Sequence, residues 1–453
     1  MTMIASDRSA LLDPLFTTER MRALTSDRAR VQGILDFEAA LALAEALSGV
    51  IPAAAVEPIG AACRAELYDL AELGRETSAA GNPAIPLLRA LTERVARTDG
   101  AAARFVHHGA TSQDAMDTGL VLQLRAVLAD LDDDLGRLAA ALERLTRTHR
   151  DTLIAGRTWL QQAEPTTLGL KTAGWLAAVD RHRARLCEER GRALAVQLGG
   201  AVGNLSALGD RGPRVVELLA EALGLSVPEL PWHTHRDRLV EVAAALGLLT
   251  GTLGKIARDV ALLMQTELAE ASEPAEPGRG GSSSMPHKRN PVRSAVAEAA
   301  ALRVPALVAT LLAGMVQEHE RGLGGWQAEW EVWPEISRLT GGALAQMAAV
   351  AEGLEVDVEG MADHVVKSGG VLQAGALAAA LSGRMGRAEA QALLEGASRR
   401  AREERRALGE ILREEGEVLR HLSEAELGRL LDPRRAAAAS AALVDRFLSG
   451  RRG

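Results

Sequence analysis

The chain has 453 residues, of which 47% are hydrophobic and 25% charged, and its formal net charge is −8. These values are ordinary for a globular protein with a large core. The acidic balance argues against a nucleic-acid-binding protein, whose partner requires a basic face, but it leaves room for a small anionic substrate held by local cations.

The N-terminal segment carries early acidic residues and lacks the charged start and apolar core of a signal peptide. Cys63 and Cys187 lie far apart and match no zinc or CxxC spacing. The uncharged stretch at residues 242–254 is shorter than the roughly 20 residues that cross a bilayer. We therefore expect a cytoplasmic protein with reduced thiols and no membrane partner.

The elements expected along the chain are helices. Ala, Leu, Glu and Arg dominate, and alternating runs of Val, Ile and Thr are absent, which predicts an all-α fold without sheet. Apolar residues recur three or four apart, and stripes of this length need partner helices, within a bundle and between subunits. Helices are expected over residues 27–47, 117–148, 166–198, 215–223, 236–268 and 291–318.

The helices are expected to fall into three domains. Prolines and glycines in residues 272–281 predict a mobile loop with glycine hinges. After about residue 356 the helices shorten and charge density rises. The expected domains are an N-terminal helical domain (residues 1–115), a central domain with the long helices and the loop (116–355), and a C-terminal helical domain (356–453).

The loop leads into the most informative segment, GSSSMPHKRNP, which runs from Gly281 to Pro291. A serine beside cations and a helix N-terminus loses its proton more easily, and Lys288 with that helix start can bind a carboxylate. No Asp/His pair accompanies the serine and no GxSxG elbow is present, so a hydrolase triad is not indicated. The alternative is an ordinary polar connection between helices.

Every fixed position of the pattern G-S-S-x-M-P-x-K-x-N-P is matched here, so the chain resembles the fumarase/aspartase superfamily. The resemblance implies that Ser282 removes a proton beside a carboxylate, and that Lys288 and Asn290 bind the substrate carboxylate and stabilise the loop. It also implies three all-α domains and a homotetramer whose active sites are shared between subunits. It implies no metal and no organic cofactor.

A second segment, residues 107–114 (HHGATSQD), is similar to the family segment H-x-G-x-T-S-x-D. The resemblance implies that Thr111, Ser112 and Gln113 hold a substrate carboxylate at a helix start. The Thr–Ser pair fits an N-cap equally well, and both roles are compatible. His107 aligns with a substrate-contacting histidine of the adenylosuccinate lyase branch, and its alternative is a structural role.

A third segment, residues 156–165 (GRTWLQQAEP), is similar to G-R-T-H-x-Q-x-A-x-P. It implies substrate contacts by Arg157, Thr158 and Gln161, and it carries Trp159 where many members have a histidine that assists the leaving group. An amine or hydroxide needs such an acid, which contributes about 10²–10⁴-fold, whereas a carboxylate, with a conjugate acid of pKa about 4, leaves unaided. Trp159 therefore favours a carboxylate leaving group or, in reverse, lactone closure.

The alternative for Trp159 is that it only packs, while His235 or His287 supplies the acid. Tryptophan at this point resembles the 3-carboxy-cis,cis-muconate cycloisomerase branch, as do residues 81–86 and 317–323. A histidine at position 235, where that branch has glutamine, is a departure.

The resemblance to this branch implies a tricarboxylate substrate from protocatechuate catabolism, lactonised through an aci-carboxylate, with Arg157 and Arg321 neutralising its charge. Two rivals stay open. One is an adenylosuccinate lyase-like enzyme that eliminates fumarate, and the other is a catalytically silent structural member.

Overall fold

The computed structural model describes residues 11–282 and 284–451, so residues 1–10, on which the signal-peptide prediction rests, lie outside it. The chain is 71% helical with 4% strand, which confirms the all-α prediction. The expectation of no sheet is wrong in detail. Two small antiparallel sheets pair β1 (Leu153–Thr158) with β2 (Gln161–Thr167), and β3 (Ala271–Ser272) with β4 (Glu355–Val356). These strands have two to seven residues, too few to show clear alternation.

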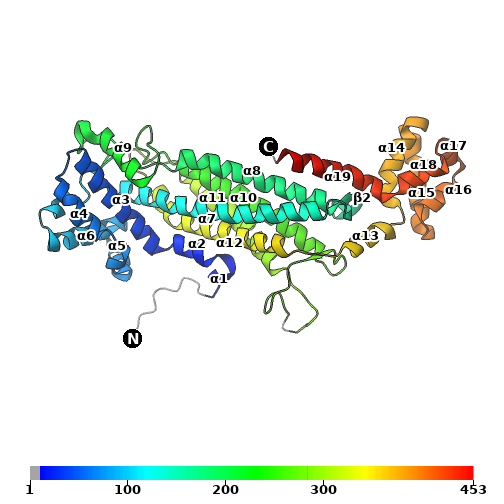
Figure 1. Cartoon of the computed structure of the whole chain (residues 1–453), viewed down its shortest axis with the longest axis horizontal. Coiled ribbons are helices and arrows are strands. Elements are labelled where there is room, and N and C mark those ends of the chain that lie inside the picture. The colour runs from blue at the N-terminus through cyan, green and yellow to red at the C-terminus, as the bar shows by residue number, and fades with distance from the viewer. Residues whose placement is uncertain (1–10, 283, 452–453) are drawn as a thin grey trace. The chain divides into compact units, whose positions relative to one another are not determined.

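The first of two compact units consists of Met1–Leu135, Arg181–Lys255 and Val296–Gln346. Its helix α3 has the predicted bounds, because Ser26 caps the first turn by accepting the N–H of Ala29. Helix α3 packs against α4 and α9 around a buried core that includes Ile34, Leu35 and Phe37 (Figure 1). The smaller helices of this unit are α1 (Asp13–Phe16), α2 (Glu19–Leu24), α3 (Asp27–Leu47), α4 (Val56–Ala62), α5 (Leu70–Ala80), α6 (Ala84–Thr98) and α9 (Gly212–Leu223).

Five long helices contribute residues to both units: α7 (Ser112–Thr148), α8 (Leu168–Ala193), α10 (Asp237–Leu263), α11 (Val292–Ala313) and α12 (Gly325–Gly353). Four of them were predicted, with ends shifted by up to five residues. Helix α8 starts at Leu168 because the preceding two threonines belong to β2. Helix α12 was missed, since Pro334 and two adjacent glycines obscure its pattern. Those glycines are required by packing, because a Cβ at Gly342 would lie 1.9 Å from the Phe16 carbonyl oxygen.

The second unit consists of Gly136–Asp180, Ile256–Ala295 and Met347–Gly453. Helices α13 and α19 contact the β1–β2 hairpin, and α14 to α18 pack around Leu377, Leu381 and Leu408 (Figure 1). The division into three domains at residues 115 and 355 stays a prediction. The helices are α13 (Val358–Lys367), α14 (Ala374–Met385), α15 (Arg387–Glu404), α16 (Leu408–Glu414), α17 (Gly416–His421), α18 (Glu424–Leu431) and α19 (Pro433–Gly450).

Helices α10 and α11 are apolar beyond what the chain itself buries. Among the described residues, these two helices are long and apolar enough to cross a membrane by length and composition alone. Leu302 of α11 is 78% exposed and Leu312 is 51% exposed, and Pro305, Ala306 and Ala309 between them are exposed as well. This spacing places an uncovered apolar stripe along one face of α11, which calls for a partner surface.

Candidate functional site

The loop that carries Ser282 is closed at its base by Asn290. The backbone N–H of Asn290 donates to the Gly280 carbonyl oxygen at 2.8 Å, and its side-chain amide donates to the same oxygen at 3.1 Å. Gly280 adopts a left-handed φ of 71°, which favours glycine. Asn290 thus joins the two ends of the loop at its base.

The Ser282 hydroxyl accepts backbone N–H groups of its own loop. The N–H of Met285 lies 3.2 Å from Ser282 Oγ, and that of Ser284 lies 3.4 Å away. N–H donors directed at an oxygen favour its negatively charged form. Ser282 is half-buried and Lys288 is exposed. The loop therefore presents a hydroxyl whose deprotonated form is stabilised, and the exposed ammonium group of Lys288 lies on the same segment.

Two charged residues, Glu273 and Arg289, hold the base of the loop in place. The buried Glu273 carboxylate accepts the N–H of Arg293 at 3.1 Å and of Ser294 at 2.7 Å, which caps the first turn of α11. Arg289 donates to the Glu355 carboxylate at 2.8 Å and to the Glu273 carbonyl at 2.6 Å. The base of the loop is anchored while its tip is exposed.

The β1–β2 hairpin displays Trp159 at its turn. Thr158 pairs with Gln161, so Trp159 and Leu160 form a two-residue turn, with φ of 53° and 62°. Positive φ at both central positions defines a type I′ turn, which normally contains Asn and Gly. Trp159 is 97% exposed and Leu160 75% exposed. Trp159 therefore does not pack against the described part of its own chain, and packing against another subunit stays open as the alternative.

Arg157, in β1, is paired within the protein. Its guanidinium donates two hydrogen bonds of 2.7 Å to Glu270, which is fully buried. His364 Nδ1 of α13 lies 2.7 Å from the same carboxylate. The positive charge of Arg157 is thus compensated, and the pair fixes the hairpin. A direct contact of Arg157 with substrate stays a prediction.

The start of α7 brings three predicted residues together. Arg321 donates to Thr111 Oγ1 at 3.2 Å and to Gln113 Oε1 at 3.0 Å. Ser112 opens the helix, and Asp114 accepts the N–H of Thr111 at 2.9 Å. Gln113 is fully buried and engaged by protein groups. The half-buried Thr111, Ser112 and Arg321 form a small cationic and hydroxyl-bearing cluster at a helix N-terminus, which suits a carboxylate.

Asp114 is a structural residue of this cluster that the site prediction left out. Its carboxylate accepts the N–H groups of Gly199 and Gly200 at 2.9 Å each, and His233 Nε2 lies 2.7 Å away. It therefore joins the start of α7 to the segment around Gly199. The fixed aspartate of H-x-G-x-T-S-x-D was the signal that could have identified it.

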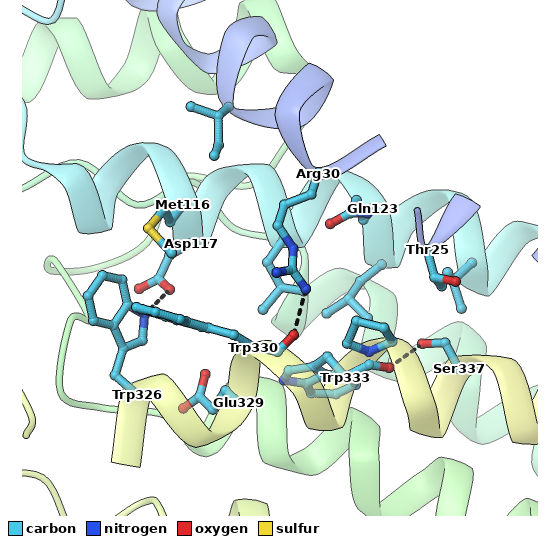
Figure 2. Close-up of a pocket in the computed structure, with 15 residues that line it drawn as sticks. Thr25, Arg30, Met116, Asp117, Gln123, Trp326, Glu329, Trp330, Trp333 and Ser337 are labelled. Atoms are coloured by element: carbon cyan, nitrogen blue, oxygen red, sulfur yellow. Dashed lines mark hydrogen bonds between the residues drawn. The ribbon is translucent and has the colours of Figure 1, made fainter. Parts of the chain in front are cut away.

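Behind this cluster lies a buried ion triad of Arg236, Asp117 and Glu329. Arg236 is 1% exposed and donates to Asp117 at 2.6 Å and to Glu329 at 2.9 Å. The Trp326 indole N–H also donates to Asp117, at 3.0 Å (Figure 2). Burial raises the pKa of Glu329, an effect that Arg236 opposes. Because Gln113 donates to Asp117 at 3.1 Å, the triad supports the side chain that Arg321 contacts.

The cavity beside the triad is small. About 40 Å³ is open between α3, α7 and α12, next to Trp326, Trp330 and Trp333 (Figure 2). That volume holds a few water molecules and no organic substrate. The triad and its cavity are therefore structural support for the neighbouring cluster.

His107, which was expected to contact substrate, is paired with a buried carboxylate, whereas His235 and His287, the two candidate acids, are exposed. His107 Nδ1 lies 2.7 Å from the buried Glu38 carboxylate of α3. His287 is exposed on the serine loop, and His235 is exposed near α10. No group of three or more His, Cys, Asp or Glu side chains placed to hold a metal ion occurs in the described part of the chain.

The candidate residues fall into two sets. His107, Thr111, Ser112, Gln113 and Arg321 belong to the first unit. Arg157, Thr158, Trp159, Gln161, Ser282, Lys288 and Asn290 belong to the second. Arg321 contacts Thr111 and Gln113 in the first unit, and Asn290 holds the base of the Ser282 loop in the second.

Known proteins match the chain over nearly its full length. The lyase family matches residues 16–306, and the adenylosuccinate lyase C-terminus family matches residues 370–447. A 3-carboxy-cis,cis-muconate cycloisomerase of Pseudomonas aeruginosa is 57% identical, over 97% of this chain and 96% of its own. A nitrosuccinate lyase of Streptomyces davaonensis is 43% identical, over 98% and 95%. The crystal structure of 3-carboxy-cis,cis-muconate lactonizing enzyme from Pseudomonas putida is 52% identical with a TM-score of 0.91, covering 97% of this chain and 98% of that one.

Proposed function

The chain belongs to the lyase family, and on that premise we propose that it interconverts 3-carboxy-cis,cis-muconate and 4-carboxymuconolactone. Relatives with this activity in their names are 57% and 50% identical over 97% of the chain, above the 43% of the nitrosuccinate lyase. The observation that carries the chemistry is the pair of backbone N–H groups directed at Ser282 Oγ.

The reaction is an addition within one molecule. A carboxylate oxygen of the substrate forms a bond to a diene carbon and closes a five-membered lactone. The displaced π electrons move toward a second carboxylate and give an aci-carboxylate. A proton then adds to the carbon beside that carboxylate. One carboxylate becomes an ester and one C–H bond forms, so each turnover takes up one proton from solvent.

Ser282 transfers that proton. In the lactonising direction its hydroxyl donates to carbon, and solvent returns the proton to the alkoxide. In reverse the alkoxide abstracts it. The N–H groups of Ser284 and Met285 stabilise the alkoxide, and Lys288 adds positive charge to the same loop. Glycine hinges at Gly278 and Gly280 permit the loop to close over substrate and exclude water.

Trp159 distinguishes this reaction from amine elimination. Indole is no acid near neutral pH, and the lactone carboxylate needs none to leave. The exposed turn leaves the Trp159 side chain available to line a substrate site. An adenylosuccinate lyase-like elimination would lack its acid at this position.

The carboxylates of the substrate need several donors. Thr111, Ser112 and Arg321 supply hydroxyls and a cation at the start of α7, and Lys288 and Asn290 supply a cation and an amide on the loop. Gln161 and Thr158 are exposed beside Trp159 and add polar contacts. As the resemblance to the fumarase/aspartase superfamily implies, we infer that residues of different subunits complete one site.

A homotetramer accounts for the uncovered stripe of α11. Exposed Leu302 and Leu312, with Leu248 of α10 at 55% exposure, form apolar surface that a bundle of helices from several subunits would bury. The same packing explains the length and apolarity of both helices without a membrane. We infer a soluble cytoplasmic enzyme of protocatechuate catabolism that acts without a metal or organic cofactor.

Mixing the purified protein with 3-carboxy-cis,cis-muconate tests the proposal. The ultraviolet absorbance of the diene is expected to fall, with 4-carboxymuconolactone identified as product by NMR. Nitrosuccinate and adenylosuccinate serve as comparison substrates, and much lower kcat/KM is expected for both. Turnover of either in preference to the muconate would replace the proposed function with an elimination. Inactivity toward all three would support a silent structural member.

A further inference from the structure

Two neighbouring histidines contact two buried glutamates of one helix face. His107 Nδ1 lies 2.7 Å from Glu38, and His108 Nδ1 lies 3.0 Å from Glu45. The glutamates are seven residues apart in α3, so they lie on one side of it. They are 1% and 0% exposed. The two pairs are close copies of each other, yet only His107 belongs to the predicted substrate site.

The buried Glu38 carboxylate contacts His107 through one of its two oxygens, Oε1. Among the described residues its second oxygen, Oε2, has no hydrogen-bond partner. A buried carboxylate with a single partner is costly unless that partner is charged. The charged form of His107 therefore stabilises Glu38, and Glu38 in return stabilises the imidazolium. Because a carboxylate only accepts, Nδ1–H is the donor and Nε2–H remains for another anion.

The charges around His107 agree with this geometry. It faces Glu38 and Glu45 of α3 and Asp114 of α7, and His108 is its neighbour. Burial lowers the pKa of His107, but the charge and hydrogen bond of Glu38, with smaller effects of Asp114 and Glu45, outweigh burial and raise it above its usual value. His107 also holds a left-handed φ of 57° on the segment that leads into Thr111 and Ser112.

The proposed substrate carries three carboxylates, and a third cation would further neutralise its charge. Lys288 and Arg321 are two of the predicted cations. Arg157 was expected to be another, but its charge is matched by Glu270 through two hydrogen bonds of 2.7 Å. His107, in the same unit as Arg321 and four residues before Thr111, is the group that can replace it.

We propose that Glu38 is a positioning residue that keeps His107 as an imidazolium, so that its Nε2–H binds one carboxylate of the substrate. This rests on the proposed function. Glu38 itself does not touch the substrate. Glu38 affects substrate binding through the charge of His107, and this effect is lost when the pH rises through the folded-state pKa of His107.

Replacement of Glu38 by Gln tests the proposal, with Glu45→Gln as the matched control on the same helix face. For E38Q we expect KM to rise about 10-fold or more with kcat changed far less, since a charged hydrogen bond is weakened. The pH at which KM begins to rise should move lower. E45Q should leave KM close to that of wild type, because Glu45 contacts His108 and Glu38 contacts His107. His107→Asn should raise KM like E38Q, and the double variant should lose no more than either alone.

Imidazole NMR titration supplies a readout that does not require turnover. The His107 resonance is expected to titrate at lower pH in E38Q than in wild type and to move much less in E45Q. An unchanged His107 titration and an unchanged KM in folded E38Q would overturn the positioning role while leaving the lactonisation intact. Absence of wild-type turnover would instead contradict the proposed function, and the titration would still decide whether Glu38 charges His107.

Discussion

Ser282 and Arg321 place opposite demands on the residues around them. In the proposed reaction Ser282 holds a negative charge for part of each turnover, and the N–H groups of Ser284 and Met285 stabilise that charge. Arg321 must keep its positive charge available although it already contacts Thr111 and Gln113. Its partners are neutral, so the charge is oriented and remains uncompensated by these contacts. Arg157 differs, because Glu270 neutralises it.

Arg321→Met tests this difference at the residue scale. We expect KM to rise about 10- to 100-fold, because a charged hydrogen-bonding group is removed, with a smaller effect on kcat. Arg157→Met is the matched variant. It should lower the thermal midpoint more than it changes KM, because the buried Glu270 loses both hydrogen bonds from Arg157 and keeps His364 as a partner. Steady-state kinetics and thermal melts of both variants check this, and a larger KM effect at Arg157 would reverse the assignment.

Glu45 gives stability a dependence on pH. Burial raises its pKa from 4.5 to about 7, against the opposing hydrogen bond and charge of His108. The folded chain therefore binds this proton more tightly than the unfolded chain, so stability falls as the pH rises from about 4.5 to about 7, by at most about 3 kcal/mol. Glu45→Gln cannot ionise, and its thermal midpoint should fall less between pH 5 and pH 8. Parallel curves for both proteins would contradict the shift.

The short motifs predicted candidate site residues, but they did not predict the charged residues that pair with those candidates from distant parts of the sequence. The motifs named Thr111 and Asn290 as candidate site residues, and the structure places Thr111 beside Arg321 and Asn290 at the base of its loop. Glu38 and Glu270 are charged residues in regions that the sequence reads as ordinary helix or turn, and their importance comes from groups far along the chain. Glu270 and Arg157 are 113 residues apart. Burial of a charge is a tertiary property, so periodicity alone could not reveal it.

The elements show which signals are local. Helix α3 could be predicted to the residue, because an N-cap serine and an apolar spacing fix both its start and its face. The β1–β2 hairpin could not, because its type I′ turn is built from Trp159 and Leu160, which lack the turn signal of Asn-Gly. Positive φ at the non-glycine residues Trp159 and Leu160 is unfavourable, and Trp159 is a predicted site residue. Strained backbone is often kept at functional positions.

The loop element makes a further prediction through Gly280. A Cβ there would meet the Asn290 carbonyl oxygen at 3.0 Å at a φ of 71°, whereas one at Gly281 meets nothing within 4 Å. The left-handed backbone costs an alanine about 1–2 kcal/mol. Gly280→Ala should therefore lower kcat at least about tenfold, since small displacements of a catalytic group are expensive. Gly281→Ala should lose less, and circular dichroism should show both folded. An equal loss in both would contradict the role of the Gly280 conformation.

For the whole molecule, the chain alone leaves α11 uncovered and divides the candidate residues between two units. The sequence predicted the class of fold and the need for helix partners. It could not predict which stripe is left for another subunit, because buried and exposed apolar stripes have the same spacing. Assembly and activity are therefore expected to be lost together.

Leu302→Arg tests assembly. Leu302 is 78% exposed in the chain, so the substitution should leave each subunit folded, while a buried charge would prevent packing between subunits. Light scattering should show a wild-type mass near four times 47.8 kDa and a smaller species for the variant, with activity reduced in proportion. A wild-type protein that is monomeric and fully active would contradict both the tetramer and the shared site.

Proton transfer by Ser282 is tested most directly by turnover in D₂O with Ser282→Ala and, as control, Ser284→Ala. Wild type and S284A are expected to place one deuterium on the lactone carbon beside the carboxylate. For S282A we expect kcat to fall by at least about 10³-fold, with helical content and thermal midpoint preserved. Deuterated lactone formed by S282A at a rate near that of wild type would contradict the assignment of the proton to this hydroxyl.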